Sequence, residues 1–184
     1  WAGREDRAGL RPLAGMNPTE TAEVLEQMVG FAMFQGVLAV ARIPRPPTLR
    51  KRIGRSAAPR FFAAADGLTS AENVGMLVRN CAAFGVQALF VGETCASPYL
   101  RRAVRNSMGT VFELPILESA GLAGTLAELR KGGIRCIGAH PHTDRRALDE
   151  TGFGGDTCVV VGAEGNGISP AVLAACDEAV AIPM

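Results

Sequence analysis

Long apolar runs are absent from this sequence. Apolar runs such as residues 37–41 and 158–161 fall well short of the roughly 18 residues that a membrane-spanning helix needs. The first residues also lack the basic, apolar and small-residue regions of a secretory signal peptide. We therefore expect a cytoplasmic protein with no membrane insertion and no export.

Residues that commonly bind metals are also scarce. The two histidines, His140 and His142, lie in a proline-containing loop after a strand-like run, and the five cysteines form no CxxC pair. Three of the cysteines lie in or beside apolar runs, which indicates buried, reduced thiols rather than a metal or redox site. We expect no bound metal. The cysteines are Cys81, Cys95, Cys136, Cys158 and Cys176.

Charge is nearly balanced over the whole chain but not along it. The 184 residues carry a formal net charge of +1. The segment from Arg42 to Arg60 nevertheless holds seven basic residues and no acidic one, interleaved with four prolines. Two interpretations remain open: a solvated basic linker without a partner, or a contact with RNA phosphates. The candidate RNA-binding residues of this segment are Arg45, Arg50, Lys51 and Arg52.

Hydrophobic periodicity divides the chain at this linker. With 48% hydrophobic residues, 184 residues can bury one complete core and part of a second. Before the linker, residues 19–34 are predicted as a helix and residues 35–43 as a strand, which is too little for a complete domain. We therefore predict a partial N-terminal α/β substrate-binding module with its linker at residues 1–58, and a second domain at residues 59–184.

Strand-like and helix-like segments alternate in the second domain. Apolar strands separated by helices are typical of an α/β fold with a parallel sheet and helices on both faces. Such sheets bind ligands beyond the carboxyl ends of their strands. Gly85 and Gly132-Gly133 stand where helices should end. The predicted strands span residues 60–65, 86–91, 111–114, 134–139, 157–161 and 179–182, and the predicted helices span residues 70–84, 97–106, 122–131 and 170–176.

A glycine-rich loop near the end of the chain is a candidate ligand site. A strand-like run leads into a loop with three glycines in six positions, Gly162, Gly165 and Gly167, and Ser169-Pro170 then has the pattern of a helix start. This arrangement suits a small polar ligand held by backbone groups. A dinucleotide fingerprint would open the first helix of its unit, so we do not expect an NAD site.

The predicted helix at residues 70–84 has one exposed arginine of interest. Its apolar positions form a buried stripe, and Arg79 lies far from that stripe. Asn73 falls in the first turn, and Gly75 lets another chain or a ligand approach closely. From this pattern, Arg79 is either an ordinary surface arginine or a functional one.

Four ordered motifs stand out in the second domain. They are Asn73-Val-Gly75-x-x-x-Arg79 with Phe84-Gly85, Arg105-x-Ser107-Met108-Gly109, Val161-Gly162-x-Glu164-Gly165-x-Gly167-Ile168-Ser169, and Cys176-Asp177 with Ile182-Pro183-Met184. Together they resemble the SpoU branch of the SPOUT RNA methyltransferases. Their order and spacing are far more specific than any one motif.

The resemblance implies an enzyme that uses S-adenosylmethionine to methylate a ribose 2′-hydroxyl in tRNA or rRNA. It also implies a homodimer and a C-terminal trefoil knot, which periodicity does not suggest because knots are nearly absent from proteins. The glycine-rich loop and neighbouring strand ends would hold the cofactor. The cofactor-binding residues implied are Gly138, Ala139, Gly162, Ala163, Glu164, Gly165, Gly167, Ile168, Ile182 and Met184.

The same resemblance assigns catalytic roles. Arg79 matches the arginine to which the family gives the activation of the ribose hydroxyl. Because the pKa of arginine exceeds about 12, we expect Arg79 to clamp the phosphate or ribose and to stabilise the developing alkoxide rather than to act as a base. Asn73 would orient the target nucleotide or the loop. Glu164 would be a buried carboxylate that orients the loop by accepting hydrogen bonds from the backbone or from Asn73, or it could stabilise the loop without a catalytic role. Arg102 and Arg105 would contact RNA phosphates, although Arg105 could instead brace the turn that follows it.

One motif of the family is missing. In its members the Ile-Pro-Met segment is followed by a glycine-containing turn and a Ser-Leu-Asn stretch with catalytic and cofactor contacts, whereas this sequence stops at Met184. We expect the natural protein to continue. Two other functions remain as alternatives: a non-catalytic RNA-binding protein with a methyltransferase fold, and a small-nucleotide-binding α/β module unrelated to RNA.

Overall fold

Six parallel strands form one sheet in a computed structural model, which describes residues 27, 42–43, 46, 48–141 and 152–181. The chain divides into two units, Trp1–Pro44 and Arg45–Met184. The helix and strand predicted before the linker fall almost entirely outside the described residues. Residues 45–58, which we grouped with the N-terminal module, belong to the second unit, and all elements named below lie in it. The two-domain organisation stays a prediction.

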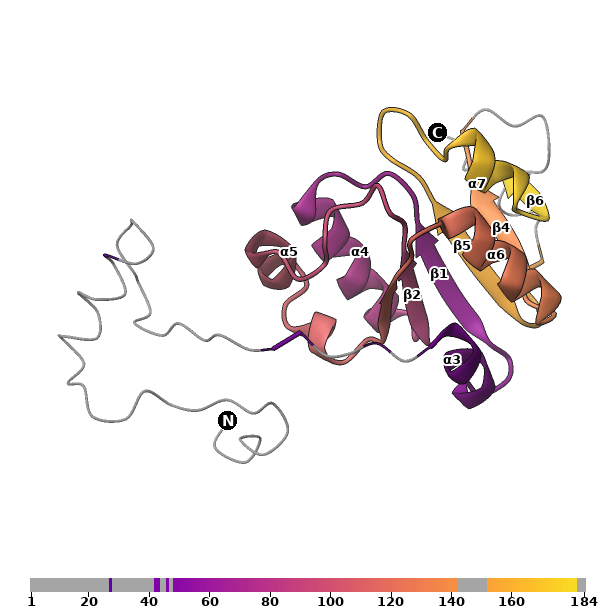
Figure 1. Ribbon diagram of the computed structural model, residues 1–184, viewed down its shortest axis with the longest axis horizontal. Helices are drawn as coiled ribbons and strands as arrows, with labels where there is room; N and C mark the ends of the chain where they lie inside the picture. The colour runs from indigo at the N-terminus through magenta and orange to yellow at the C-terminus, as the bar shows by residue number, and fades with distance from the viewer. Residues whose placement is uncertain (1–26, 28–41, 44–45, 47, 142–151, 182–184) are drawn as a thin grey trace. The chain divides into compact units, whose positions relative to one another are not determined.

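The sheet has the strand order β3-β2-β1-β5-β4-β6, and every neighbouring pair is parallel (Figure 1). The predicted parallel α/β sheet is therefore confirmed. Its central strands, β1 and β5, come from segments far apart in the sequence. The strands are β1 Phe61–Ala65, β2 Ala88–Val91, β3 Ile116–Glu118, β4 Arg135–Ala139, β5 Thr157–Val161 and β6 Glu178–Val180.

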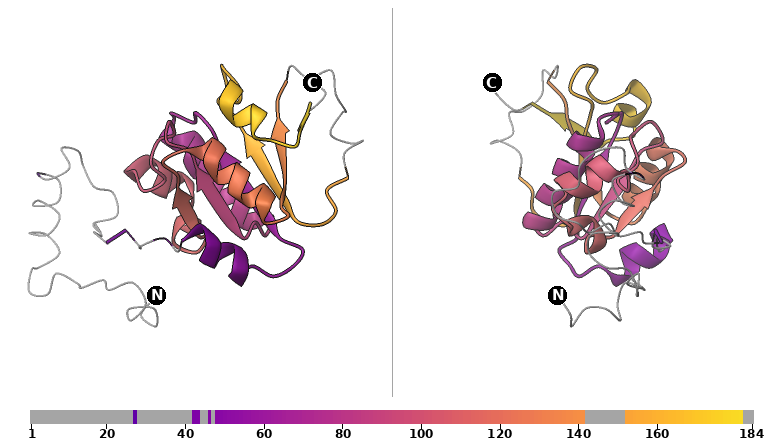
Figure 2. Two further views of the ribbon diagram at one scale, coloured as in Figure 1. Left: turned by 45° about the vertical axis from the view of Figure 1, so that its right-hand side comes forward. Right: turned by 90° about the vertical axis from the view of Figure 1, so that its left-hand side faces the viewer.

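Helices cover both faces of the sheet, as predicted (Figures 1 and 2). Alternate residues of β1 point to opposite faces: Phe62 and Ala64 join one apolar cluster, and Ala63 and Ala65 join the other. The first cluster packs against α3, α6 and α7, and the second against α4 and α5. Full burial of a large apolar side chain such as Phe62 contributes about 1.5–3 kcal/mol. The helices are α3 Leu49–Arg55, α4 Ala71–Ala83, α5 Arg101–Asn106, α6 Leu122–Lys131 and α7 Pro170–Ala174.

The helix ends follow the residues that predicted them. The hydroxyl of Ser70 caps α4 by accepting a hydrogen bond of 3.3 Å from the N–H of Asn73. Gly85 and Gly133 adopt φ values of +72° and +79° just after α4 and α6. The predicted helices at residues 97–106 and 170–176 are shorter in the structure. Among the described residues, no helix is long and apolar enough to span a membrane.

The strand predicted at residues 111–114 is wrong. Thr110–Phe112 forms the 3₁₀ helix η2, and the strand of this region is β3. Val111 and Leu114 are buried at a helical spacing of three, and the N–H groups of Glu113 and Leu114 both donate to the carbonyl of Thr110. The strand begins directly after Pro115. Proline has no N–H to donate, and the start of an edge strand tolerates such a residue.

The helix α3 was not predicted, because the prolines of the basic linker pointed to irregular structure. These prolines flank the helix and do not interrupt it. Thr48 caps the helix through a hydrogen bond of 3.4 Å between its Oγ1 and the N–H of Lys51. Leu49 and Ile53 pack against the apolar cluster on the α6 face. The basic linker is thus partly an ordered element of the second unit.

Candidate functional site at the carboxyl edge of the sheet

The carboxyl ends of four strands lie level with one another at one edge of the sheet. In the strand register, Ala65 of β1 pairs with Val161 of β5, Val161 pairs with Ala139 of β4, and Ala139 pairs with Val180 of β6. Because the strands are parallel, the loops that follow them emerge side by side. This is the edge at which sheets of this class bind ligands.

The glycine-rich loop leaves β5 at this edge and is closed by its own backbone. Ala163 and Gly167 exchange two N–H···O=C hydrogen bonds, each 2.9 Å long. A Cβ on Gly162 would lie 2.1 Å from the carbonyl carbon of Gly167, so no side chain fits there. Gly167 adopts a φ of +66°, and a Cβ on it would lie 3.1 Å from Nδ1 of His140. The closure of the loop therefore requires glycine at both positions.

A buried carboxylate ties this loop to β1. Asp66 directly follows β1 and is 5% exposed. Its Oδ2 accepts a hydrogen bond of 2.7 Å from the N–H of Ser169, the N-cap residue of α7, and its own N–H donates to the carbonyl of Val161 at 2.9 Å. Asp66 thus holds both ends of the loop. Sequence analysis missed this residue, although an aspartate directly after an apolar strand is a usable signal for the carboxyl edge.

Two predicted cofactor residues, Gly138 and Ile168, also serve the packing of α7 on β4. A Cβ on Gly138 would lie 3.1 Å from Cδ1 of Ile168 and 3.3 Å from Cδ1 of Leu173. The side chain of Ile168 is buried in the core. The half-buried Ala139 and Ala163 lie at neighbouring strand ends, as expected for this edge. The predicted residues Ile182 and Met184 lie outside the described part of the chain.

Glu164, Gly165 and Asn166 form the exposed tip of the loop. The expectation of a buried Glu164 carboxylate is therefore wrong: the bridge between Ala163 and Gly167 turns the three residues between them outward. Within the described residues, no hydrogen bond joins Glu164 to Asn73, and the N–H groups of the three tip residues donate to no backbone carbonyl. These N–H groups are available to a ligand.

Helix α4 places Asn73 near the carboxyl edge and Arg79 farther along. The helix follows β1, so Asn73 in its first turn adjoins this edge, and Arg79 lies about 9 Å further along the helix axis. Arg79 is exposed and lies off the buried face, as predicted. Gly75 does permit a close approach, but by α5 of the same unit: a Cβ on Gly75 would lie 2.4 Å from the carbonyl oxygen of Ala103.

The two predicted RNA-binding arginines of α5 are exposed. Arg102 Nη1 lies 3.0 Å from Oε1 of Glu72, in an ion pair between α5 and α4. The backbone N–H of Glu72 and the hydroxyl of Ser70 hydrogen-bond to this carboxylate and lower the pKa of Glu72 below its ordinary value. Arg102 therefore has a charged partner. The side chain of Arg105 makes no hydrogen bond or ion pair with the described residues.

The predicted RNA-binding residues of the linker lie at the opposite edge of the sheet. Arg50 and Lys51 are exposed on α3, and the guanidinium of Arg52 donates to the carbonyl of Gln87, just before β2. Because α3 packs beside the starting ends of the strands, these cations are at the amino edge and far from the glycine-rich loop. Arg45 lies outside the described residues.

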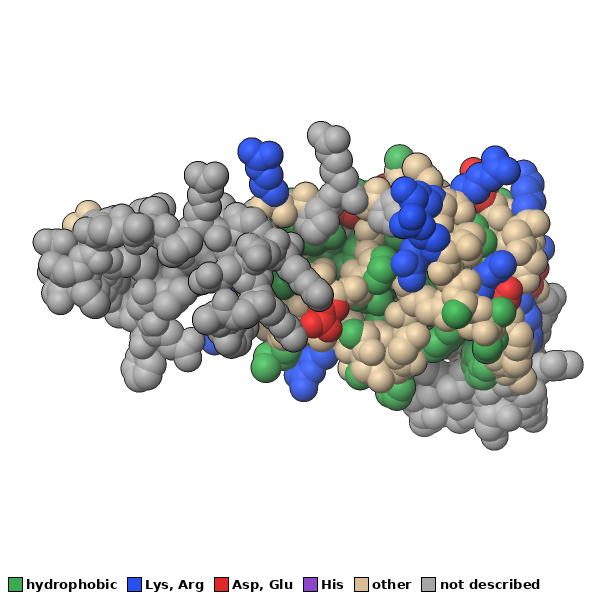
Figure 3. Space-filling view, turned by 90° about the horizontal axis from the view of Figure 1, so that it is seen from below, with side chains coloured by type: hydrophobic (Ala, Val, Ile, Leu, Met, Phe, Trp, Pro, Cys, Tyr) green, Lys and Arg blue, Asp and Glu red, His purple; other side chains and the backbone are tan. Residues whose placement is uncertain are grey.

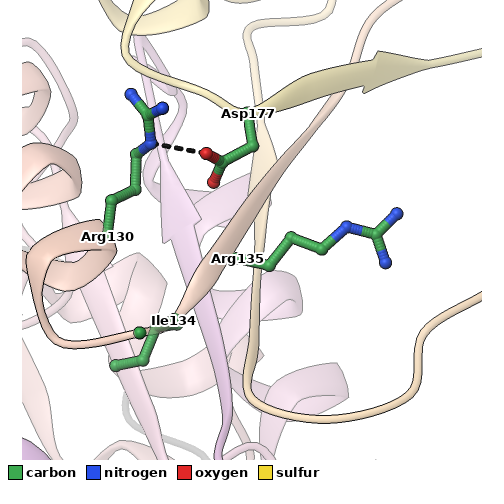
Figure 4. A pocket seen from close by; sticks show the side chains of 5 residues that line it. Arg130, Ile134, Arg135 and Asp177 are labelled. Atoms are coloured by element: carbon green, nitrogen blue, oxygen red, sulfur yellow. Dashed lines mark hydrogen bonds and ion pairs between the residues drawn. The ribbon is translucent and has the colours of Figure 1, made fainter.

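A pocket opens at this amino edge (Figure 4). Arg130 points toward Asp177, and Nε donates to Oδ1 at 2.6 Å, while Oδ2 accepts a hydrogen bond of 2.8 Å from the N–H of Cys136. Arg135 points away from this pair and forms an ion pair with Glu178. These charged side chains pair with one another, and their ion pairs hold α6, β4 and β6 together. Its lining residues are Arg130, Gly133, Ile134, Arg135 and Asp177.

Comparison with known proteins identifies the family. Residues 60–184 match the model of the SpoU rRNA Methylase family. The chain belongs to the SpoU family. An uncharacterized tRNA/rRNA methyltransferase of Mycobacterium bovis is 35% identical to it over 168 residues, which cover 89% of this chain and 57% of that relative. The SpoU chain thus spans little more than half the length of this relative.

Solved structures share the SpoU fold. The SpoU methyltransferase AviRb from Streptomyces viridochromogenes, crystallised in complex with AdoMet, superposes with a TM-score of 0.73 at 24% identity, covering 100% of this chain and 78% of that chain. An RNA 2′-O ribose methyltransferase superposes with a TM-score of 0.73 at 23% identity, covering 100% of this chain and 76% of that chain. These likenesses establish the α/β fold of the SpoU methyltransferases for this chain.

Proposed function

We propose that this protein methylates a ribose 2′-hydroxyl in tRNA or rRNA with S-adenosylmethionine as the methyl donor. The observation that carries the proposal is the closed glycine-rich loop, held by Asp66 level with the neighbouring strand ends. Family membership supplies the reaction class. The relative from Mycobacterium bovis is named a tRNA/rRNA methyltransferase, and one protein of the same fold is named an RNA 2′-O ribose methyltransferase.

The residues of the carboxyl edge fit this cofactor. The tip of the loop offers backbone N–H groups that donate to no backbone carbonyl within the described residues, and a Cβ on Gly165 would meet nothing within 4 Å. Such N–H groups donate to the carboxylate, hydroxyl and ring-nitrogen acceptors of a nucleoside-like ligand. When bound, S-adenosylmethionine supplies an electrophilic methyl group. The loop from Gly162 to Ile168 would hold it, together with Gly138, Ala139, Ile182 and Met184.

The catalytic work of the chain is to align and activate the ribose hydroxyl. Arg79, whose side chain is exposed, binds the phosphate or ribose of the target nucleotide and stabilises the negative charge that develops on the oxygen. Asn73, near the carboxyl edge, orients the nucleotide. Glu164, at the exposed loop tip, orients the loop against the bound ligands and not against Asn73. In this proposal the protein is a homodimer with a trefoil knot.

The test uses the full-length protein with methyl-labelled S-adenosylmethionine and total RNA. Label incorporated into tRNA or rRNA, recovered after digestion as a 2′-O-methylated nucleoside, supports the proposal. RNA that is retained by the protein without label identifies a non-catalytic RNA-binding protein instead. Mapping the 2′-O-methyl positions lost from a deletion strain then identifies the target nucleotide.

The variant Arg79→Ala tests the role of the arginine. We expect methylation to fall about 10²- to 10³-fold, the loss typical for removing one group that stabilises developing charge. The affinity for S-adenosylmethionine, measured by calorimetry, should stay within about threefold because Arg79 lies on α4 and not on the loop. Asn80→Ala, a change at the neighbouring exposed residue of the same helix, should keep full activity. Full methylation by Arg79→Ala would show that this arginine is only a surface residue.

A further inference from the structure

We infer that the amino edge of the sheet carries a second RNA-binding surface, which holds the backbone of a structured RNA away from the reacting ribose. We call it the amino-edge basic surface and define it by Arg50, Lys51, Arg55 and Lys131. The inference rests on the proposed RNA methyltransferase function and adds a location for the RNA outside the catalytic edge.

The helix α3 is fixed in place and not a solvated linker. Leu49 and Ile53 pack against the core, Arg52 donates to the carbonyl of Gln87, and the hydroxyl of Ser56 donates to the carbonyl of Arg52 at 3.0 Å. Gln87 Nε2 also donates to the carbonyls of Ala57 and Pro59, at 3.0 and 3.2 Å. Because one side of the helix is anchored, its remaining cations are held in defined positions.

The end of α6 extends this surface. Ile53 of α3 reaches Gly132, since its Cδ1 would lie 3.9 Å from a Cβ there, and Arg60 Nη1 lies 3.5 Å from the carbonyl oxygen of Gly132. Lys131 directly precedes Gly132 and is exposed. The last turn of α6 and the helix α3 are therefore neighbours.

Three carboxylates of this edge are already paired with other cations. Arg60 Nη1 lies 3.4 Å from Oδ2 of Asp156, Arg130 pairs with Asp177, and Arg135 pairs with Glu178. The four cations of the amino-edge basic surface have no ion-pair partner in the described part of the chain. Exposed Glu128 of α6 offsets one of them in part. Seen from below, basic side chains gather in several groups, with acidic ones only in small spots (Figure 3).

This surface fits a polyanion and not a membrane. The apolar residues of α3 are packed against the core, and among the described residues the large exposed hydrophobic side chains lie on neither α3 nor α6. A membrane-bound helix would need such side chains on its outer face. Held, uncompensated cations attract phosphate groups of nucleic acid through release of counterions.

The position of the surface determines what kind of RNA can reach it. β1 has five residues, so the amino and carboxyl edges are about 15 Å apart at 3.3 Å per residue. An RNA that occupies both edges must extend several nucleotides beyond the methylated one. At 3.4 Å per nucleotide along a helical strand, the two edges are about four to five nucleotides apart. We therefore expect a structured tRNA or rRNA segment to occupy both edges, whereas an oligonucleotide shorter than this reaches the carboxyl edge only.

The test is a variant of the full-length protein with Arg50, Lys51, Arg55 and Lys131 all changed to Gln. With the RNA identified in the methylation assay, we expect the affinity to fall about 10- to 100-fold. The negative slope of log K against log salt should become shallower by about 3, because four phosphate contacts are lost. The control exchanges Arg for Lys and Lys for Arg at the same positions, and it should bind the RNA within about threefold of wild type because the charge is kept.

Two further arms separate the possible outcomes. A short oligonucleotide around the target nucleotide should bind the Gln variant as it binds wild type. Unchanged affinity and salt slope with folded RNA would overturn the inference, as would a loss of binding to polyglutamate with RNA affinity retained, which would indicate an acidic protein partner. Binding of S-adenosylmethionine and methylation by wild type are measured in parallel, so failure of the proposed function is recognised separately.

Discussion

At the residue scale, two carboxylates do similar structural work at opposite edges of the sheet. Asp66 accepts the N–H of Ser169 at the carboxyl edge, and Asp177 accepts the N–H of Cys136 at the amino edge. Asp66 holds the start of α7, and Asp177 holds the start of β4. Only Asp66 adjoins the proposed cofactor site. Variants of the two aspartates can therefore distinguish an effect on stability from an effect on cofactor binding.

We predict that Asp66→Ala lowers both stability and cofactor affinity. Loss of a hydrogen bond to a charged group costs about 1.5–3 kcal/mol of unfolding free energy, and the released loop should bind S-adenosylmethionine at least about tenfold more weakly. Asp66→Asn, which keeps an acceptor oxygen, should recover part of the affinity. Asp177→Ala should lose comparable stability in urea unfolding with unchanged affinity by calorimetry. Equal affinity losses in both Ala variants would contradict a positioning role for Asp66.

Buried thiols give the protein an alkaline limit. Burial raises the pKa of Cys81 to about 11, so the folded protein keeps this proton above about pH 9, where an unfolded cysteine loses it. The neutral Cys81 thiol therefore contributes its full share to the free energy of unfolding below pH 9. This share is lost as the pH rises toward 11, by up to about 1.4 kcal/mol per pH unit. Urea midpoints measured at pH 8, 9 and 10 should fall with pH, and less steeply for Cys81→Ala. Parallel pH profiles would show that this thiol is not responsible.

At the element scale, the contact between α4 and α5 depends on Gly75. We predict that Gly75→Ala destabilises the protein by about 1–3 kcal/mol, because the new methyl group would collide with the carbonyl of Ala103 and force the helices apart. The matched control is Gly124→Ala within α6, where a Cβ meets nothing within 4 Å. It should stabilise the protein by about 0.5–1 kcal/mol through helix propensity. Thermal unfolding of both variants should give shifts of opposite sign, and a neutral Gly75→Ala would disprove the close contact.

Element prediction succeeded where local patterns were unambiguous. The segments predicted at residues 122–131 and 157–161 match α6 and β5 at both ends. The first has helical periodicity and the second is a β-branched run, and these two patterns are easily distinguished within a short segment. It failed at residues 111–114, because a segment of four residues is too short for the spacing of Val111 and Leu114 to distinguish a 3₁₀ turn from a strand. It missed α3, whose apolar positions, Leu49 and Ile53, gain meaning only from the sheet on which they pack.

At the scale of the whole molecule, strand position sets local stability. β1 and β5 pair on both sides, whereas the three-residue strands β3 and β6 each pair on one side within the described part of the chain. We predict that backbone amides of β1 and β5 exchange with deuterium most slowly, near the rate of global unfolding, and that those of β3 and β6 exchange faster. Hydrogen-exchange mass spectrometry measures this order directly. Slower exchange in β6 than in β5 would mean that the edge is covered in solution.

The parallel α/β class, most of the order of helices and strands after residue 60, the glycine-rich loop and the exposed Arg79 could be predicted from residue patterns, because periodicity and turn chemistry act over a few residues. The family motifs extended that prediction to a methyltransferase. Other features depend on contacts between distant segments: Asp66 and Ser169 are 103 positions apart, the bridge from Ala163 to Gly167 exposes Glu164, and the packing of α3 carries its cations to the amino edge. Local patterns do not contain such contacts, so folding of the chain was needed to reveal them.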